Sequence, residues 1–413
     1  YGARPFKKEN YIKKFRILTD KIITKKESKR FLNTVQKLRQ LKKGQLYKLN
    51  VCFDTKSKLV SISKKIPVKK MFNNTYPYKS SMSKTMLNSF KNLSKEIKKR
   101  FKPNLFLEIG SNDGALIRNF NIKNTVCVEP CSNLAKITQK MGYFTYAKYW
   151  NFSLSKTIKK KFNNVDVIYA ANTLTHIANL NDVFRSITNI LSEEGVLIIE
   201  DPSLLECIKK TSYDQFYNEH IYVFSALAVS NVIDKFDLEL FDIQKINTHG
   251  GSLRYFIKRK KNKNIKTFKS VSIQINSEIK FGLNKLSTYI KFGEKTLLSK
   301  QKLVKLLINL KKQRKTIVGY GATAKATTVL NYCNIDHNII DFFVDTTPDK
   351  INKFMPGKKI AIKKYNKKIY KNVDYFLLGA WNFKKEIFNK EKKFIKKGGK
   401  FIVHVPSPKI INK

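Results

Sequence analysis

Three proton-handling side chains stand within four residues of each other in the middle of the chain. They are Tyr217, Glu219 and His220. A carboxylate close to an imidazole can orient the ring and raise its basicity, so this group is a candidate general base with two supporting residues. Asn172 and His176 are four residues apart, and they share one face if a helix starts there. The alternatives are a solvated turn for the first group and a helix cap or a satisfied core histidine for His176.

A glycine loop follows an apolar run further upstream. The sequence Leu105-Phe-Leu-Glu-Ile-Gly-Ser-Asn-Asp-Gly114 predicts a strand that turns directly into a helix beginning near Ala115. Gly110 permits a tight turn, and Gly114 lets the backbone approach a ligand at the helix N-terminus, where free N–H groups favour an anionic group. The pattern E-x-G-x-x-x-G differs from the dinucleotide fingerprint G-x-G-x-x-G. It resembles motif I of class I S-adenosylmethionine (SAM) methyltransferases.

Acidic side chains surround this loop. Glu129 ends the second predicted strand about twenty residues on, where a carboxylate can accept hydrogen bonds from two ribose hydroxyls. Glu108 and Asp113 add negative charge around a cofactor that carries a sulfonium and an ammonium. An ordinary glycine turn is the alternative, but strand, loop, helix and spaced glutamate together favour a cofactor site. The predicted cofactor-binding residues are Glu108, Gly110, Asn112, Asp113, Gly114, Glu129 and Pro130.

A second glycine loop lies near the C-terminus. Residues 316–324, Thr-Ile-Val-Gly-Tyr-Gly-Ala-Thr-Ala, fit G-x-G-x-x-A, and Asp345 ends the next predicted strand as a ribose-binding acid would. Read alone, this pattern indicates an NAD(P)-dependent oxidoreductase. The favoured alternative is a Rossmann-like domain that keeps the turn without binding a dinucleotide.

Alternating apolar runs and amphipathic segments predict the elements that position these residues. Residues 96–248 read as an α/β domain with a largely parallel sheet, and a second such unit begins near residue 314. We therefore expect an N-terminal module over 1–95, a connecting strand and helical segment over 249–313, and a C-terminal domain over 314–413. The predicted strands are Leu105–Gly110, Thr125–Glu129, Val165–Ala170, Val196–Glu200, Ser252–Ile257, Thr316–Gly319, Ile340–Val344, Tyr375–Leu378 and Phe401–Val405.

The net charge is +53, from 83 Lys and Arg against 30 Asp and Glu, and such a balance is typical of nucleic-acid or membrane-surface partners. The composition argues against that interpretation here. Only 10 of the basic residues are arginine, whose planar fork grips phosphate and stacks on bases, and the lysines spread over the whole chain. The 37 asparagines indicate the same AT-rich coding bias as the lysines. We expect no nucleic-acid partner, and a nucleic-acid-binding methyltransferase is the weakest alternative.

Several features of the sequence bear on location. No stretch approaches 18 uninterrupted apolar residues and no apolar leader opens the chain, so we expect neither a membrane span nor secretion. The five cysteines are few, scattered and odd in number, which fits reduced cytoplasmic thiols and gives no disulfide framework. The predicted location is cytoplasmic, and the sequence leaves the oligomeric state open.

A resemblance to a known family rests on five motifs that occur in order. They are Glu-Ile-Gly-Ser-Asn-Asp-Gly at 108–114, Tyr-x-Glu-His at 217–220, His-Gly-Gly-Ser-Leu-Arg at 249–254, Gly-Tyr-Gly-Ala-x-Ala-Lys with Leu-Asn-Tyr-Cys at 319–333, and Ala-Trp-Asn-Phe at 380–383. From about residue 46 to its end, the chain resembles the nucleotide-sugar C-methyltransferases, which include enzymes that make branched deoxysugars such as mycarose.

The resemblance implies a fold and a reaction. The family has a zinc-binding N-terminal module, a SAM-binding middle domain and a Rossmann-like C-terminal domain, and it methylates carbon beside the ketone of a 4-keto-hexose nucleotide such as a dTDP-sugar. His220 would remove the proton from sugar C3, and Glu219 and Tyr217 would support it. Asn172 and His176 would contact the sugar and the developing enolate. A base and donors to the enolate oxygen suffice for this chemistry, so no metal is required.

The resemblance also implies substrate-binding residues. Either Tyr76 or Tyr78 would reach the sugar, and Gly319, Gly321 and Lys325 would lie near phosphate. SAM-dependent O-methylation of a nucleotide-sugar is the nearest alternative activity, because the same cofactor loop would serve it.

The chain departs from the family in the zinc module. Leu59-Val60 stands where a C-x-x-C-G-L-V pattern would place these two residues, so Asp54 and Ser57 occupy the cysteine positions. Cys52 is out of register, and no other cysteine occurs in the first 126 residues. Structural zinc is almost always held by four protein ligands. We therefore predict a degenerate module without structural zinc.

Overall fold

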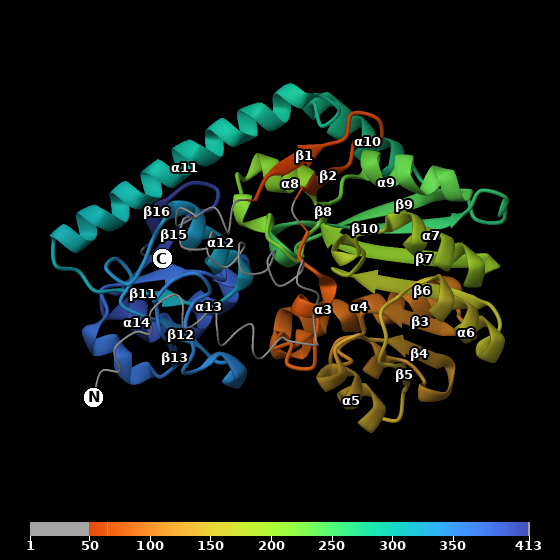
Figure 1. Ribbon diagram of the computed structural model, residues 1–413, viewed down its shortest axis with the longest axis horizontal. Coiled ribbons are helices and arrows are strands. Elements are labelled where there is room, and N and C mark those ends of the chain that lie inside the picture. Colours follow the sequence, from red (N-terminus) through yellow and green to blue (C-terminus); the bar gives the residue numbers. More distant parts are fainter. Residues whose placement is uncertain (1–48, 64, 412–413) are drawn as a thin grey trace, which may run out of the picture. The chain divides into compact units, whose positions relative to one another are not determined.

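The structure is a computed structural model that describes residues 49–63 and 65–411, apart from the side chains of 369–371 (Figure 1). Leu49–Lys413 make one compact unit. It contains two large sheets, each flanked by helices, and a small three-stranded sheet. The predicted α/β class, with two successive Rossmann-like domains, is confirmed.

The middle sheet has seven strands in the order β5-β4-β3-β6-β7-β10-β9. The first five are parallel, whereas β10 pairs antiparallel with both β7 and β9. By position along the chain the order is 3-2-1-4-5-7-6. The strands are β3 (Phe106–Ile109), β4 (Thr125–Val128), β5 (Phe144–Tyr146), β6 (Val165–Ala171), β7 (Leu191–Pro202), β9 (Leu238–Ile246) and β10 (Ser252–Arg259).

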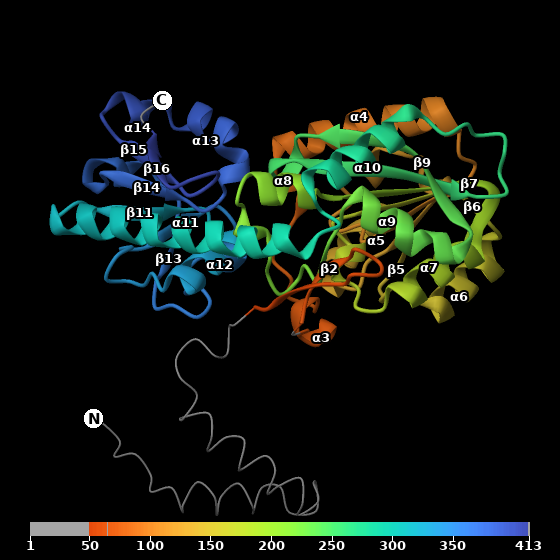
Figure 2. The same cartoon turned by 90° about the horizontal axis from the view of Figure 1, so that it is seen from above.

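Helices cover both faces of this sheet, as Figure 2 shows for α4 on one side and α6, α7 and α9 on the other. Successive side chains of a strand point to opposite faces, so a sheet buried on both faces needs apolar residues throughout. In β3, Phe106 packs with α4 whereas Leu107 and Ile109 pack with α6 and α7. The helices are α4 (Lys84–Phe101), α5 (Ser132–Lys140), α6 (Phe152–Phe162), α7 (Leu180–Ile190), α8 (Leu204–Lys209), α9 (Ala226–Ile233) and α10 (Lys269–Phe281).

Two predicted boundaries fall inside these elements. Residue 95 lies within α4, whose buried residues Met86, Phe90 and Leu93 pack on the middle sheet. The strand expected to connect the two domains is β10, which is the central antiparallel strand of the middle sheet. Its all-buried residues Ser252–Lys258 could not be assigned to a sheet by periodicity alone, because the neighbours that bury them are distant in sequence.

The C-terminal sheet has the order β13-β12-β11-β14-β15-β16, with β16 antiparallel to its neighbour and the others parallel. It joins the middle domain through α11 (Leu286–Lys312), the long helix in Figure 1, which buries Leu303, Leu307 and Leu310. The strands are β11 (Ile317–Tyr320), β12 (Phe343–Asp345), β13 (Ile362–Lys364), β14 (Tyr375–Leu378), β15 (Lys400–Val403) and β16 (Lys409–Ile411), and the helices are α12 (Ala324–Cys333), α13 (Lys384–Lys390) and α14 (Lys392–Lys396).

The described part of the N-terminal module begins with a hairpin of β1 (Val51–Phe53) and β2 (Val60–Ile62). Strand β2 also pairs with β8 (Tyr222–Val223), and the short helix α3 (Val68–Met71) follows the hairpin in the chain. Residues 1–48 lie outside the described part. The Asp54 carboxylate accepts the backbone N–H of Lys56 at 2.7 Å and of Ser57 at 3.1 Å, so it closes the hairpin loop. In the described ranges no three or more His, Cys, Asp or Glu are grouped to hold a metal, and the absence of zinc stays a prediction.

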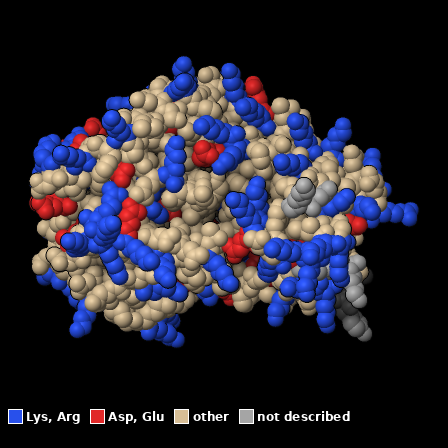
Figure 3. Space-filling model, turned by 180° about the vertical axis from the view of Figure 1, so that it is seen from behind, with Lys and Arg blue, Asp and Glu red and all other residues tan. Residues whose placement is uncertain are grey.

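Positive charge is spread over the surface. Figure 3 shows Lys and Arg side chains scattered over most of the visible face, with acidic residues between them. This distribution agrees with the diffuse lysine pattern of the sequence. None of the helices in the described ranges is long and apolar enough to cross a membrane.

Candidate active site

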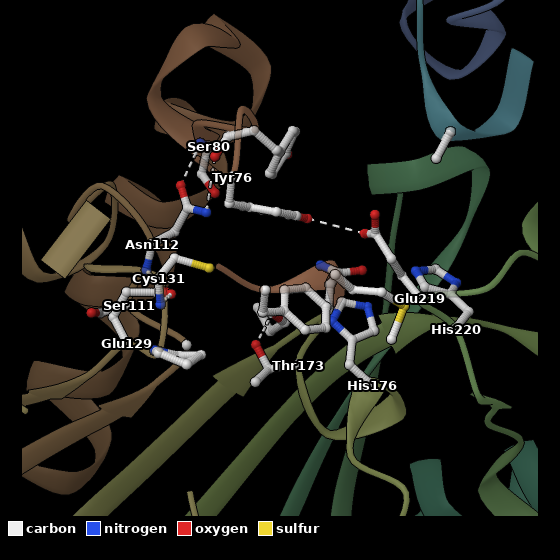
Figure 4. Close-up of a pocket in the computed structure, with 18 of the residues that line it drawn as sticks. Tyr76, Ser80, Ser111, Asn112, Glu129, Cys131, Thr173, His176, Glu219 and His220 are labelled. Carbon is white, nitrogen blue, oxygen red and sulfur yellow. Dashed lines mark hydrogen bonds between the residues drawn. The ribbon is translucent and has the colours of Figure 1, made fainter. Parts of the chain in front are cut away.

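A cavity of about 630 Å³ lies where the loops of the middle sheet meet the first helix of the C-terminal domain. Its volume is in the range of small-molecule sites. Thirteen of the residues singled out from the sequence line it: Tyr76, Tyr78, Glu108, Gly110, Asn112, Glu129, Pro130, Asn172, His176, Tyr217, Glu219, His220 and Lys325. Figure 4 shows the glycine-loop residues on one side of the cavity and His176, Glu219 and His220 on the other. Asp113, Gly114, Gly319 and Gly321 are not among the lining residues.

The loop after β3 forms a tight turn at Gly110. Its φ is +78°, and a Cβ placed there would come 2.2 Å from Thr173 Oγ1, so only glycine fits. Two polar atoms at this turn, Glu108 Oε2 and Ser111 Oγ, are buried without a hydrogen-bond partner among the described residues. Burial, with Glu129 and Asp113 nearby, raises the pKa of Glu108 well above its usual value. A cradle with unsatisfied acceptors fits a ligand that carries donors and positive charge.

Glu129 organises the same loop. Its Oε2 accepts the backbone N–H of Asn112 at 2.9 Å, and its Oε1 accepts that of Cys131 at 2.8 Å. Each carboxylate oxygen has a second lone pair, so these bonds leave acceptors for ribose hydroxyls. Burial raises the pKa of Glu129.

The segment after the loop differs from the prediction. No α-helix begins near Ala115; the chain forms turns and a short 3₁₀ helix, Ile117–Asn119. Side chains compete for the carbonyls that a helix would use, because Arg118 Nε donates to the Gly114 carbonyl at 3.1 Å and Asn119 Nδ2 donates to that of Leu116 at 2.9 Å. The expectation of a helix N-terminus at Gly114 is therefore wrong.

Asn112 and Asp113 instead anchor the N-terminal segment over the cavity. Asn112 Oδ1 accepts the backbone N–H of Ser80 at 2.9 Å, and its Nδ2 donates to the Tyr78 carbonyl at 3.2 Å. The Asp113 carboxylate is hydrogen-bonded to the backbone and hydroxyl of Ser81. These bonds tie the predicted cofactor loop to the segment that carries the two candidate tyrosines.

His220, the predicted general base, is held in a buried position on the cavity wall. It is 5% exposed, and its Nε2 lies 2.6 Å from the Tyr217 hydroxyl. Burial lowers the pKa of His220 well below its ordinary value, and His176, Lys325 and His249 act in the same direction. Burial also raises the pKa of Tyr217 well above its ordinary value. The lowered pKa favours the unprotonated imidazole, and the tautomer of His220 decides which atom donates in this hydrogen bond.

The remaining members of this group support the base from two sides. The Tyr76 hydroxyl donates to Glu219 Oε2 at 3.0 Å, so the N-terminal segment reaches the catalytic group through Tyr76 (Figure 4). Tyr78 also lines the cavity but is 41% exposed. Burial raises the pKa of Glu219.

His176 stacks on His220 with ring centroids 5.1 Å apart, and its other face stacks on Phe72 at 5.2 Å. Burial lowers the pKa of His176 to about 3, and its Nε2 has no hydrogen-bond partner within the described residues. The helix that would align Asn172 with His176 does not form. Asn172 has φ +49°, and only a 3₁₀ turn, Leu174–His176, follows; both side chains still line the cavity because the turn brings them to the same strand end.

His249 is a lining residue that the sequence reasoning missed. Its Nε2 is buried without a partner among the described residues, and burial beside Lys325 lowers its pKa to about 3. Gln215 Nε2 donates to the His249 carbonyl at 2.8 Å and holds the loop. The motif at 249–254 contains His249, but its spacing from other residues along the chain does not indicate that this histidine lines the same cavity as His220.

The second glycine loop begins α12 at the opposite end of the cavity. The loop and helix start, Ala322–Lys325, line the cavity, and the Thr323 side chain caps the helix. Gly319 lies against Phe343, whose ring a Cβ would approach to 2.4 Å. Asp345 accepts the backbone N–H of Ala322 and Thr347, each at 2.8 Å. The carboxylate expected for an NAD ribose therefore organises this loop in the same way as Glu129 organises the first one, and the interpretation as a domain without a dinucleotide stays a prediction.

Comparison with known proteins agrees with this geometry. A family model described as a methyltransferase domain matches residues 78–243, and one described as a C-methyltransferase C-terminal domain matches residues 247–406. The C-methyltransferase NovU of Streptomyces niveus is 28% identical over 310 residues, which cover 75% of this chain and 74% of NovU.

Solved structures show similarity to the middle part of the chain. A SAM-dependent methyltransferase from Clostridium acetobutylicum aligns with a TM-score of 0.32 and 14% identity over 42% of this chain and 92% of its own. Magnesium protoporphyrin IX methyltransferase (ChlM) from Synechocystis, solved with SAH, aligns with a TM-score of 0.32 and 10% identity over 42% and 83% of the two chains.

The strand order 3-2-1-4-5-7-6 with its glycine loop and the methyltransferase match define a class I SAM-dependent methyltransferase. In this chain the match to a methyltransferase domain precedes the match to a C-methyltransferase C-terminal domain, and the chain is similar to the C-methyltransferase NovU.

Proposed function

We propose that this C-methyltransferase acts on a nucleotide-linked 4-keto-deoxyhexose, such as a dTDP-sugar, by removing the proton at C3 and methylating the resulting enolate carbon. One observation carries the proposal: a buried, neutral His220 faces the same cavity as the cofactor-type glycine loop. A C–H beside a ketone is only weakly acidic, so its removal needs a positioned base in a site that excludes water.

The glycine-loop side of the cavity supports SAM as cofactor. When bound, SAM supplies an electrophilic methyl group. Glu108 and Ser111 offer unsatisfied polar atoms at the turn, and the Glu129 carboxylate is held at the end of β4, where ribose hydroxyls are commonly bound. Gly110 keeps the turn open for close approach. These residues would hold the cofactor on the side of the cavity opposite His220 (Figure 4).

The C-terminal side of the cavity supports an anionic substrate. The first residues of α12 line the cavity, and a helix N-terminus favours phosphate. Lys350 also lines the cavity, and its Nζ lies 3.6 Å from Asp345 Oδ2. A nucleoside diphosphate at this end would place the attached sugar between Tyr76 and His220.

The proposal is tested by incubating the full chain with ¹³C-methyl SAM and dTDP-4-keto-6-deoxyglucose. The expected product carries the label on C3, observed by NMR as a methyl group bound to carbon. A label on oxygen would instead favour the O-methyltransferase alternative. No transfer to any 4-keto nucleotide-sugar would contradict the proposal.

The base is tested by His220→Ala. Positioned acid–base groups contribute about 10²- to 10⁴-fold, so we expect the turnover number to fall by at least about 100-fold. His337→Ala is the matched control, because His337 is an exposed histidine of the C-terminal domain outside the cavity lining. Unchanged turnover in His220→Ala would show that another group takes the proton.

A further inference from the structure

Lys325 is a buried cation without an ionic partner. It is 8% exposed and is the second residue of α12. Across residues 49–63 and 65–411, its Nζ makes no hydrogen bond and no ion pair; it lies 5.7 Å from the centroid of the Tyr217 ring. Removing an ammonium from water without a counter-ion is costly, so such a group normally either pairs or neutralises.

The other buried lysine shows the usual arrangement. Lys258 is 2% exposed, and its Nζ lies 2.7 Å from Glu239 Oε1. Two carboxylates near Lys325 have other partners: Trp381 Nε1 donates to Asp214 Oδ2 at 2.6 Å, and Tyr76 donates to Glu219. Asp214 Oδ1 is buried without a hydrogen-bond partner among the described residues. Burial lowers the pKa of Lys325, and Asp214, Cys207 and Glu219 act in the opposite direction. Lys325 lines the cavity, where a negative group that arrives would become its ionic partner.

The position of Lys325 indicates which negative group that is. Its Nζ lies over the ring of Tyr217, and the Tyr217 hydroxyl lies 2.6 Å from the Nε2 of the base. Lys325 thus lies close to the tyrosine that contacts the candidate base, whereas the first turn of α12 and Lys350 remain for phosphate. The same ammonium lowers the pKa of His220, which keeps the base unprotonated before the reaction.

We propose that Lys325 is a catalytic residue that stabilises the oxyanion of the enolate; this role rests on the function proposed above. His220 takes the C3 proton, the electron pair of the C–H bond becomes the carbon–carbon π bond, and the carbonyl π pair moves to the oxygen beside the ammonium. C3 then forms its bond to the methyl group, the carbonyl re-forms, and the methyl–sulfur bonding pair stays on sulfur. The ammonium acts on charge that exists only during the reaction.

The test separates this role from phosphate binding. The full chain is mixed with dTDP-4-keto-6-deoxyglucose and SAH in D₂O, and NMR follows exchange of the C3 proton at saturating sugar. Affinity for dTDP alone is measured by calorimetry. For Lys325→Met we expect exchange to fall about 100- to 1,000-fold, as when one oxyanion donor is removed, with the Kd for dTDP within twofold of wild type. Lys325→Arg, which keeps the charge, should retain more exchange than Lys325→Met.

A stability measurement distinguishes loss of a catalytic group from loss of folded structure. Because Lys325→Met removes an unpaired buried charge, we expect its denaturation midpoint without ligand to equal or exceed that of wild type. Lys353→Met is the matched control, because Lys353 is an exposed lysine outside the cavity lining, and it should leave exchange, affinity and stability unchanged.

Four outcomes would overturn the inference. Unchanged exchange in Lys325→Met would remove the catalytic role. Weaker binding of dTDP with an unchanged exchange rate at saturating sugar would assign Lys325 to phosphate binding. A lower denaturation midpoint, with the exchange rate reduced in proportion in both the methionine and the arginine variants, would assign Lys325 to folding. If wild type itself exchanges no C3 proton and transfers no methyl group, the proposed function fails and this role fails with it.

Discussion

Replacing Gly110 by alanine tests the cofactor side of the cavity. The residue has φ +78°, and an added Cβ would meet Thr173 Oγ1 at 2.2 Å and Thr173 Cγ2 at 2.8 Å. Both distances are shorter than carbon atoms tolerate, so either the loop or Thr173 must move. The Thr173 hydroxyl donates to the Ala171 carbonyl at 2.9 Å, and this bond resists such a movement.

The cost follows from these contacts. A left-handed conformation costs an L-residue about 1–2 kcal/mol, and loss of the Thr173 hydrogen bond adds about 0.5–1.5 kcal/mol. If the alanine loop keeps its shape, this cost lowers the free energy of unfolding. If the alanine loop instead adopts another shape when no cofactor is bound, SAM must restore the original shape on binding. The cost then appears as weaker SAM binding, and each 1.4 kcal/mol raises the Kd about tenfold. The two losses together should reach about 2 kcal/mol or more.

Both quantities are measured on the same protein: SAM affinity by calorimetry and unfolding by denaturant. Gly293→Ala is the control, because Gly293 lies in α11 with open space around its Cβ position and no positive φ. It should stabilise the protein by about 0.5–1 kcal/mol and leave the SAM Kd unchanged. Adding Thr173→Ala to Gly110→Ala should recover part of the loss, because it removes the two closest atoms. If Gly110→Ala matches wild type in both measurements, the account of this loop is wrong.

Two further predictions concern the other side of the cavity. Tyr76→Phe removes the donor to Glu219 Oε2 and should lower the turnover number up to about tenfold, since a hydrogen bond contributes about 0.5–1.5 kcal/mol and about 1.4 kcal/mol is tenfold in rate. Tyr78→Phe, at a residue 41% exposed, should lower it less, and the reverse order would identify Tyr78 as the sugar contact. The pKa of His176 is lowered to about 3 in the folded protein, so the unfolded chain binds the extra proton and stability falls as pH drops below about 6.5. His176→Gln should therefore reduce the loss of unfolding free energy between pH 6.5 and pH 5 by about 2 kcal/mol, whereas an equal loss in both proteins would mean that His176 protonates freely when folded.

The sequence predicted much of the fold because parallel sheets leave a strong local signal. Strands β3, β4, β6 and β14 lie within one or two residues of their predicted bounds, since apolar runs buried on both faces are readable without knowing the neighbours. The helix after Gly114 was predicted wrongly, because a glycine loop indicates the turn but not what Arg118 and Asn119 do with the carbonyls that follow.

The candidate site divides in the same way. The sequence by itself determined the glycine turn, the carboxylates near it and the Tyr-x-Glu-His group, because these depend on residue types at short spacing. Only the tertiary structure decided that Tyr76 contacts Glu219, that His249 lines the same cavity as the two other histidines, and that Lys325 lies 5.7 Å from the centroid of the Tyr217 ring. Tyr76 and Glu219 are 143 residues apart in the sequence. Helix α12, which carries Lys325, belongs to the C-terminal domain, whereas His220 belongs to the middle domain. Contacts of this kind arise when separate domains close on one cavity, and spacing along the chain carries no information about that closure.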